Sequence, residues 1–178
     1  MKKHLTLLFV FVCVCLFAQE EKITFRFDAD TIKTIVIKVP GMKASEIYDR
    51  TVGWSKSFYV KNYDLILSRD SINYTLSYSD TFYMPFDTDL KAGLYKEHNH
   101  AYYKLSIECY DNRYLVCFEH IKFVDNFLED TYFKLTDFFW DPRRYKEKLE
   151  GYEANISLVI NSINTYIKTQ EFVQPRKW

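Results

Sequence analysis

The chain has 178 residues, of which 24 are Lys or Arg, 24 are Asp or Glu and 19% are aromatic. This length suits one domain that can bury a sizeable core without disulfides or a metal. The balanced charge excludes the concentrated basic footprint that nucleic-acid binding needs. The many Tyr and Phe residues favour a β-rich core with Tyr hydroxyl groups at its rim.

The N-terminus has the pattern of a cleaved export signal. Lys2 and Lys3 precede an apolar run over residues 5–17, and Ala18 is a small residue at the expected cleavage point. The run is too short to span a bilayer comfortably. We therefore expect residues 1–18 to be removed. The remaining 160 residues carry a net charge of −2 and would work in the periplasm or outside the cell, with no stable membrane anchor.

The first part of the mature chain predicts a strand and then a helix. Residues 31–39 are β-branched and alternate weakly, and Pro40 ends this strand. Residues 23–27 could form a further short strand. Over 43–58 the apolar residues recur every three or four positions, which predicts an amphipathic helix, although Gly53 weakens it by about 1 kcal/mol relative to Ala. The recurring residues are Ile47, Thr51, Trp54 and Phe58.

A first hairpin is predicted after this helix. Strands over 64–68 and 72–78 are joined at 69–71. In the second strand, apolar and aromatic residues alternate with small polar ones, so we expect only one face of the sheet to be covered. The apolar positions are Ile72, Tyr74, Leu76 and Tyr78.

A second hairpin joins strands over 102–110 and 114–123. Asp111 and Asn112 form its turn, because both residues tolerate the left-handed backbone of a tight turn. A two-residue turn fixes which residues face each other. The expected pairs are Leu105 with Phe118, Ile107 with Val116 and Cys109 with Tyr114 on the buried side, and Lys104 with Glu119 and Ser106 with Cys117 on the other side.

This register separates the two cysteines of the mature chain. Cys109 and Cys117 lie on opposite faces of the hairpin, so they cannot form a disulfide within it. The other two cysteines leave with the export signal. We expect two free thiols that act as small hydrophobic groups. His120 is expected at the end of the apolar face near Tyr103, hydrogen-bonded and inert.

The C-terminal part predicts one long helix. Residues 125–140 are rich in aromatic side chains and have no assigned structure. Asp141 and Pro142 fit the N-cap and first position of a helix, and apolar residues then recur at helical spacing to about Lys168. This apolar stripe is long enough to lie across a whole sheet. Residues 170–178 are expected to form a tail.

The predicted order is strand, helix, four strands, helix. It indicates an α+β fold in which a short helix and a long C-terminal helix pack on one face of a single antiparallel sheet. We expect one domain over residues 31–169, preceded by an N-terminal segment over 19–30.

A long connection over residues 79–101 stands out between two predicted strands. Connections of this length in a compact domain are usually functional or disordered. Its aromatic residues either fold back onto the sheet edge or form an exposed platform for a partner. Its two histidines face one way on an extended chain, but such spacing is common by chance and we predict no metal site. The candidate binding residues are Phe82, Tyr83, Phe86, His98 and His100.

Two runs of the chain resemble one known family. They are TIVIKVPGMKASEIYDRTVGW and YYKLSIECYDNRYLVCFEHI. The family is the exported bacterial domain-of-unknown-function family four-four-six-eight, and the resemblance covers residues 31–123 and the last helix by position. It implies a TBP-like fold, which is the strand, helix, four strands, helix arrangement of one TATA-binding-protein repeat. Lys43 departs from the family pattern, where a Ser-like helix cap is expected, and the 79–101 connection is longer.

The fold that the resemblance implies raises the question of DNA binding. In TATA-binding protein the open sheet face is a DNA saddle. Here the predicted open face mixes acidic and polar groups with scattered basic ones, so we expect no nucleic-acid partner. The polar and acidic residues are Asn73, Thr75, Ser77, Ser106, Glu108 and Glu119, and the basic ones are Lys38, Lys104 and Arg113.

No motif predicts an enzyme, and the resemblance assigns no catalytic residue. The four glycines stand far apart, so the chain has no phosphate-cradling loop and no dinucleotide fingerprint. Cys117 and His120 are three apart on a strand, on opposite faces, and cannot act as a dyad. We expect no cofactor.

The leading interpretation is a non-enzymatic binding or accessory module. It would act in the cell envelope on a protein or small-molecule partner, through the open sheet face or the 79–101 connection. The alternative is a small-molecule or lipid carrier, with a cavity between the long helix and the sheet.

Overall fold

The computed structural model describes residues 22–27, 32–58, 66–86, 97–125, 132–133 and 142–173. The predicted order of strand, helix, four strands and helix is confirmed, with one short strand added. The expected export signal over 1–18 lies outside the described residues. In chain order the elements are β1 (Ile32–Lys38), α2 (Ala44–Phe58), β2 (Ile66–Asp70), β3 (Thr75–Phe86), β4 (Glu97–Tyr110), β5 (Arg113–Asp125), β6 (Tyr132–Phe133) and α4 (Pro142–Thr169).

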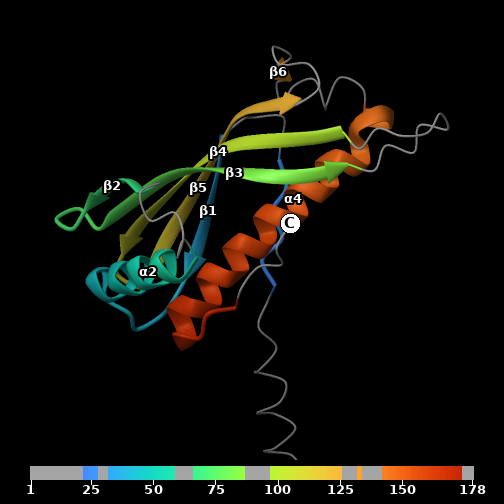
Figure 1. The fold of residues 1–178 in the computed structure, drawn as a ribbon. Helices are drawn as coiled ribbons and strands as arrows, with labels where there is room; N and C mark the ends of the chain where they lie inside the picture. The colour runs from blue at the N-terminus through green and yellow to red at the C-terminus, as the bar shows by residue number, and fades with distance from the viewer. Residues whose placement is uncertain are drawn as a thin grey trace, which may run out of the picture.

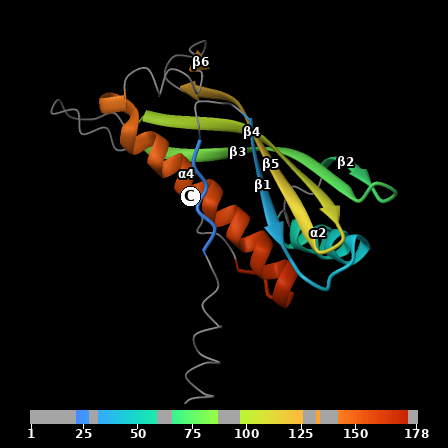
Figure 2. The ribbon, with the colours of Figure 1, turned by 180° about the vertical axis from the view of Figure 1, so that it is seen from behind.

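The strands form one antiparallel sheet in the order β1-β5-β4-β3-β2, and β6 pairs with β5 beyond the start of β1. Figures 1 and 2 show α2 and α4 on the same side of this sheet, and no described element covers the other side. The predicted register of the β4–β5 hairpin is confirmed, because Leu105 pairs with Phe118 and Ile107 with Val116. The core therefore lies between the helices and one face of the sheet.

Aromatic rings fill much of this core. Tyr103 of β4 stacks on Phe118 of β5 with ring centroids 4.9 Å apart. The helix stripes predicted from the sequence point at these rings, and Trp54 of α2 and Ile160 of α4 are fully buried. Many of the aromatic rings of the described residues therefore pack in the core. The fully buried rings are Phe25, Trp54, Tyr78, Tyr103, Tyr114, Phe118 and Tyr152.

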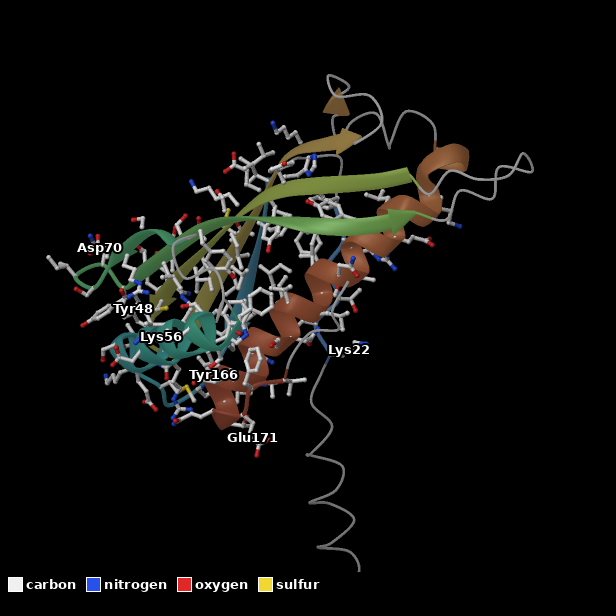
Figure 3. The ribbon with its side chains drawn as sticks, in the orientation of Figure 1. Lys22, Tyr48, Lys56, Asp70, Tyr166 and Glu171 are labelled. Carbon is white, nitrogen blue, oxygen red and sulfur yellow. The ribbon has the colours of Figure 1, made fainter. Side chains whose placement is uncertain are left out.

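Residues 22–27, which we call the N-terminal strap, lie along α4 and form no strand (Figure 2). Figure 3 labels Lys22 at the start of the strap. The main chain of the strap bonds to polar side chains of the helix, so the short strand that the sequence allowed over 23–27 does not form. The bonds run from Ile23 N–H to Asn161 Oδ1 (2.9 Å), from Phe25 N–H to Ser157 Oγ (2.9 Å), from Phe27 N–H to Glu153 Oε1 (2.8 Å), and from Asn161 Nδ2 to the Ile23 carbonyl (2.7 Å).

These bonds can form in series because the spacing of the bonding residues along α4 matches their spacing along the strap. The bonding residues on α4 are four residues apart, about 6 Å along a helix, and those on the strap are two residues apart, about 6.6 Å along an extended chain. Phe25 and Phe27 consequently both point into the core. Phe27 stacks on Tyr152, and Phe25 meets Phe118 edge-on with ring centroids 5.6 Å apart. The strap thus completes the core between α4 and β5.

The Asp111–Asn112 turn holds the start of α2 as well as its own hairpin. Asp111 Oδ1 accepts a hydrogen bond from Ala44 N–H and its Oδ2 accepts one from the Lys43 ammonium, both at 3.0 Å, and these bonds lower the pKa of Asp111. The Asn112 carbonyl accepts from Val39 N–H at 2.9 Å. Because the cap comes from the hairpin, Lys43 can stand where a Ser-like cap was expected.

The β2–β3 hairpin turns later in the chain than predicted. Its turn is at 71–74 instead of 69–71, because Asp70 Oδ1 accepts the N–H groups of Asn73 and Ile72 and fixes an Asx turn. These bonds lower the pKa of Asp70, which Figure 3 labels at this tip. Ile72 was predicted on the apolar face and is 86% exposed in the turn.

The expected long connection over 79–101 is mostly strand. β3 continues to Phe86 and β4 begins at Glu97, and these two residues are paired. Pro85 obscured the strand pattern. It is tolerated here because, among the described residues, β2 pairs only as far as Tyr78, which leaves this end of β3 at the edge of the described sheet. The residues between the two strands lie outside the described part of the chain.

Gly53 has a packing role that its low helix propensity hides. A Cβ atom added to Gly53 would lie 2.9 Å from the Tyr166 hydroxyl of α4. Figure 3 shows Tyr166 where α2 and α4 approach each other. The glycine therefore allows a close contact between the helices that a larger residue would disturb.

We expect Phe25→Ala in the strap to lower the free energy of unfolding by about 3–5 kcal/mol, because it empties a fully buried ring position. The matched control is Thr24→Ala, which changes an exposed neighbour and should stay within about 0.5 kcal/mol of the parent. Urea denaturation followed by tryptophan fluorescence measures both values. Equal effects of the two substitutions would show that the strap does not contribute to the core.

Candidate functional site: the uncovered sheet face

The sheet face opposite the helices carries most of the exposed apolar side chains. In the described part of the chain seven large hydrophobic residues are exposed, and five of them lie on strands of this face. The three aliphatic ones, Ile32, Val36 and Ile121, are 52%, 56% and 51% exposed. Tyr102 and Tyr110 complete this group, which we call the exposed apolar set. Large contiguous patches of exposed apolar residues mark interaction sites, and this set shares one face of the sheet.

Strand β1 explains why the sequence did not reveal this set. Ile35 and Ile37 point to the helix side of β1, while Ile32 and Val36 point away from it. An apolar strand of this kind alternates only weakly in hydropathy, so its outer face cannot be separated from its inner face by pattern alone. The expectation of a polar open face was therefore incomplete. One of its residues, Asn73, lies in a turn.

A row of small side chains crosses the middle of the uncovered face. The hydroxyl groups of Ser77 and Ser106 are 3.0 Å apart and hydrogen-bonded. Small side chains leave the sheet backbone close to the surface, so an extended or flat partner could approach it. The row crosses five strands, and each residue in it is paired in register with the next. From β1 to β2 its residues are Thr34, Cys117, Ser106, Ser77 and Ser68.

Two cations on this face lie over aromatic rings. The Arg113 guanidinium carbon is 5.5 Å from the centre of the Tyr110 ring, and Lys122 Nζ is 5.0 Å from that of Tyr102. The Tyr110 hydroxyl donates to Glu108 at 2.8 Å, and this bond raises the pKa of Tyr110. Both tyrosines of the exposed apolar set are thus oriented by charged neighbours, which holds their rings in place for contact with a partner.

The five residues predicted to bind within the 79–101 connection are strand residues. Phe82, Tyr83 and Phe86 belong to β3, and His98 and His100 belong to β4. The backbone register brings Tyr83 opposite His100. The side chains of all five lie outside the described part of the structure, so a role in binding stays a prediction.

His120 and Cys109 of the β4–β5 hairpin lie on the helix side of the sheet. Burial lowers the pKa of His120 to about 4, and its Nδ1 is 3.0 Å from the Tyr152 hydroxyl. Burial also raises the pKa of the Cys109 thiol to about 12. Cys109 and Cys117 are both free thiols on opposite faces, as predicted. Within the described ranges, no three His, Cys, Asp or Glu side chains gather as metal ligands.

Two surface hollows lie away from the uncovered face. One, of about 470 Å³, lies beside the strap and α4 and includes Phe25, Arg26 and Glu150 in its lining. The other, of about 430 Å³, lies between α2 and the end of α4, where Arg50 binds the Glu46 carboxylate and the Ile167 carbonyl. In the part of the chain that the structure describes, no helix is long and apolar enough to cross a membrane.

A family model described as "Domain of unknown function (DUF4468) with TBP-like fold" matches residues 34–124. The chain belongs to this family. The match confirms the resemblance seen in the two sequence runs, and the observed element order is the TBP-like one. Because the function of DUF4468 is unknown, membership gives the fold and leaves the activity open.

Two solved structures are similar to this DUF4468 chain. One is a DUF4468 family protein from Bacteroides ovatus, with a TM-score of 0.60 and 15% identity over 79% of this chain and 89% of that one. The other is a TBP-like protein from Parabacteroides distasonis, with a TM-score of 0.57 and 16% identity over 80% of this chain and 96% of that one. At these identities the likeness shows the fold alone. A comparison with curated proteins found no match.

Because His120 is buried, we expect the free energy of unfolding to fall at acidic pH. Unfolding restores its ordinary pKa near 6.5, so between about pH 6.5 and pH 4 the unfolded chain takes up a proton that the folded one does not. Stability should fall through this window by up to about 3 kcal/mol. His120→Gln keeps a hydrogen-bonding group for Tyr152 but does not titrate. Urea denaturation between pH 7 and pH 4 should therefore show a flatter profile for His120→Gln, and parallel profiles would contradict the assignment.

Proposed function

We propose that this protein is a non-enzymatic binding module of the cell envelope that acts through its uncovered sheet face. The observation that carries the proposal is the exposed apolar set, in which three aliphatic side chains and two oriented tyrosines share one face. The envelope location comes from the export signal expected over residues 1–18.

The energetics of this face suit association with a partner. Covering a half-exposed Ile or Val side chain gains on the order of 1 kcal/mol, so several together supply useful affinity. The tyrosine rings add apolar area with a polar tip, which is common at interfaces. The central row of small residues adds hydroxyl groups without blocking access to the sheet.

The uncovered face is a better candidate than the connection proposed from the sequence. Residues 79–86 and 97–101 extend β3 and β4 and lengthen the sheet, so the predicted connection is largely part of the same surface. A role for Tyr83 and His100 in this longer face is compatible with their paired backbone positions.

The carrier alternative gains no support from the described core. A carrier needs an internal cavity between the long helix and the sheet. In this region, seven rings and the α4 stripe are packed against each other, and both hollows noted above open on the outer surface. The proposal therefore rests on the surface of the sheet.

Site-specific photocrosslinking in producing cells tests the proposal. A benzoylphenylalanine introduced in place of Ile121 or Tyr110 should give an adduct heavier than the protein alone and different in mass from its dimer. The same group in place of Lys56, which is exposed on α2 on the other side of the sheet, is the matched control and should give no such adduct.

A substitution makes the test quantitative. With the photoreactive group at position 110, Ile121→Ser should lower the adduct yield about tenfold, because it removes an aliphatic contact worth about 1.4 kcal/mol. An adduct of equal yield from position 56, or one that Ile121→Ser leaves unchanged, would show that the partner does not use this face.

A further inference from the structure

The two edges of the sheet are built differently. At one edge, β2 is five residues long, its register shifts between Ile66 and Ser68, and Arg69 and Asp70 place charges on it. Such features protect an edge strand from pairing with another chain. At the other edge, β1 is seven residues long and pairs with β5 without a register shift. Of these two strands, β1 is the one suited to accept a further strand.

The hydrogen-bond pattern shows which main-chain groups β1 turns outwards. Val39 N–H donates to the Asn112 carbonyl, in line with the β1–β5 register. In an antiparallel pair, bonded and non-bonded residues alternate, so the odd-numbered residues Ile37, Ile35 and Lys33 bond to β5. The even-numbered residues therefore point their N–H and C=O groups away from the sheet. These residues are Ile32, Thr34, Val36 and Lys38.

These outward groups are a template for another strand. Outside the helices and strands, none of the backbone hydrogen bonds among the described residues involves these four residues. Ile32, Thr34 and Val36 carry no charge. The two lysines of the strand lie near its ends, and Lys33 Nζ is 6.0 Å from the centre of the Phe25 ring of the strap, on the helix side.

We propose that β1 pairs with β1 of a second copy of this chain, antiparallel about a twofold axis, so that two sheets become one. With Ile35 opposite its counterpart, Thr34 faces Val36 of the other copy and Ile32 faces Lys38. Each outward residue then meets an outward residue, as an antiparallel ladder requires. The pairing closes on itself as a dimer because the same strand serves both copies.

Charge favours a second copy as the occupant of this edge. In this register no lysine of one β1 lies opposite a lysine of the other. Ile32 pairs with Glu119 within each copy, so Lys38 of one copy lies two strands from Glu119 of the other, about 10 Å between Cα atoms on the same face. Side chains of this length can close that gap. The dimer goes beyond the proposed function, because it leaves the exposed face open and extends it across both copies.

A proline substitution at the outward edge tests the dimer. Thr34→Pro removes an N–H group that points away from β5, so the fold should tolerate it as edge strands do. It removes one main-chain bond from each copy at the dimer interface. We expect it to raise the dissociation constant of the dimer at least about tenfold in sedimentation equilibrium of the purified protein. Thr34→Ala keeps the N–H group and should leave the constant within about twofold.

Disulfide trapping keeps the test decisive if Thr34→Pro fails to fold. In a Cys117→Ser background, Ile35→Cys places two thiols opposite each other across the twofold axis and should give a disulfide-linked dimer under mild oxidation. Lys38→Cys lies six residues from its counterpart and should not. A protein that stays monomeric up to about 1 mM, or that links equally well through both cysteines, would overturn the proposal. Binding of a foreign extended peptide by a monomer would overturn it as well.

Failure of this test and failure of the proposed function are distinguishable. The crosslinking positions 110 and 121 lie on β4 and β5, away from the edge, and their adducts are scored by a mass that differs from the dimer. A monomer that still gives those adducts refutes only the dimer, and a dimer without them refutes only the partner.

Discussion

The two-residue turn at Asp111 and Asn112 is the constraint on which the rest of the structure depends. It pairs Tyr110 with Arg113 and so fixes the register of β4 and β5 as far as Tyr103 and His120, beyond which the register shifts by one residue. A slip by one residue would move Leu105, Ile107 and their partners to the uncovered face. The same turn binds the main chain at Val39 and Ala44, which places β1 beside β5 and starts α2. Register and helix position are thus set at one point.

The N-terminal strap covers part of the inner sheet face that the helices leave open. α4 crosses the sheet diagonally and cannot cover the whole inner face (Figure 1). Phe25 and Phe27 fill part of the remaining space against Phe118. Holding the strap requires polar side chains inside an otherwise apolar helix face, and this explains why Glu153 and Ser157 are buried there. The helix acts both as a core element and as a hydrogen-bonding partner for an extended chain.

Most of the fold could be predicted from the sequence because its signals are local. Alternation and the Asp–Asn turn gave the β4–β5 register, and helical spacing gave α2 and α4. The strap could not be predicted, because its bonds join residues more than a hundred positions apart. The turn at Asp70 was missed because its side-chain bonds extend the turn beyond the residues that the pattern marked. In each case tertiary or side-chain bonds overrode local pattern.

The candidate site was predicted only in part. Its polar residues, including Ser77 and Ser106, were placed on the open face by alternation. Its apolar residues were not, since β1 is apolar on both sides and resembles a fully buried strand. The aromatic residues within 79–101 pointed instead to that connection. The described structure places many of the other rings in the core, as the aromatic excess of the chain predicted.

The composition of β1 is the strongest sign that this surface is used. The inner residues Ile35 and Ile37 pack in or against the core and so stabilise the fold. Ile32 and Val36 do not, and each gives up part of the roughly 1.5–3 kcal/mol that full burial of such a side chain supplies. A polar residue at either position would serve the isolated chain as well. The β2 edge carries charges and an irregular register, so the fold can protect an edge where it needs to. Apolar side chains and open backbone therefore occur together on β1, which lacks this protection, and contact with another molecule there would bury both.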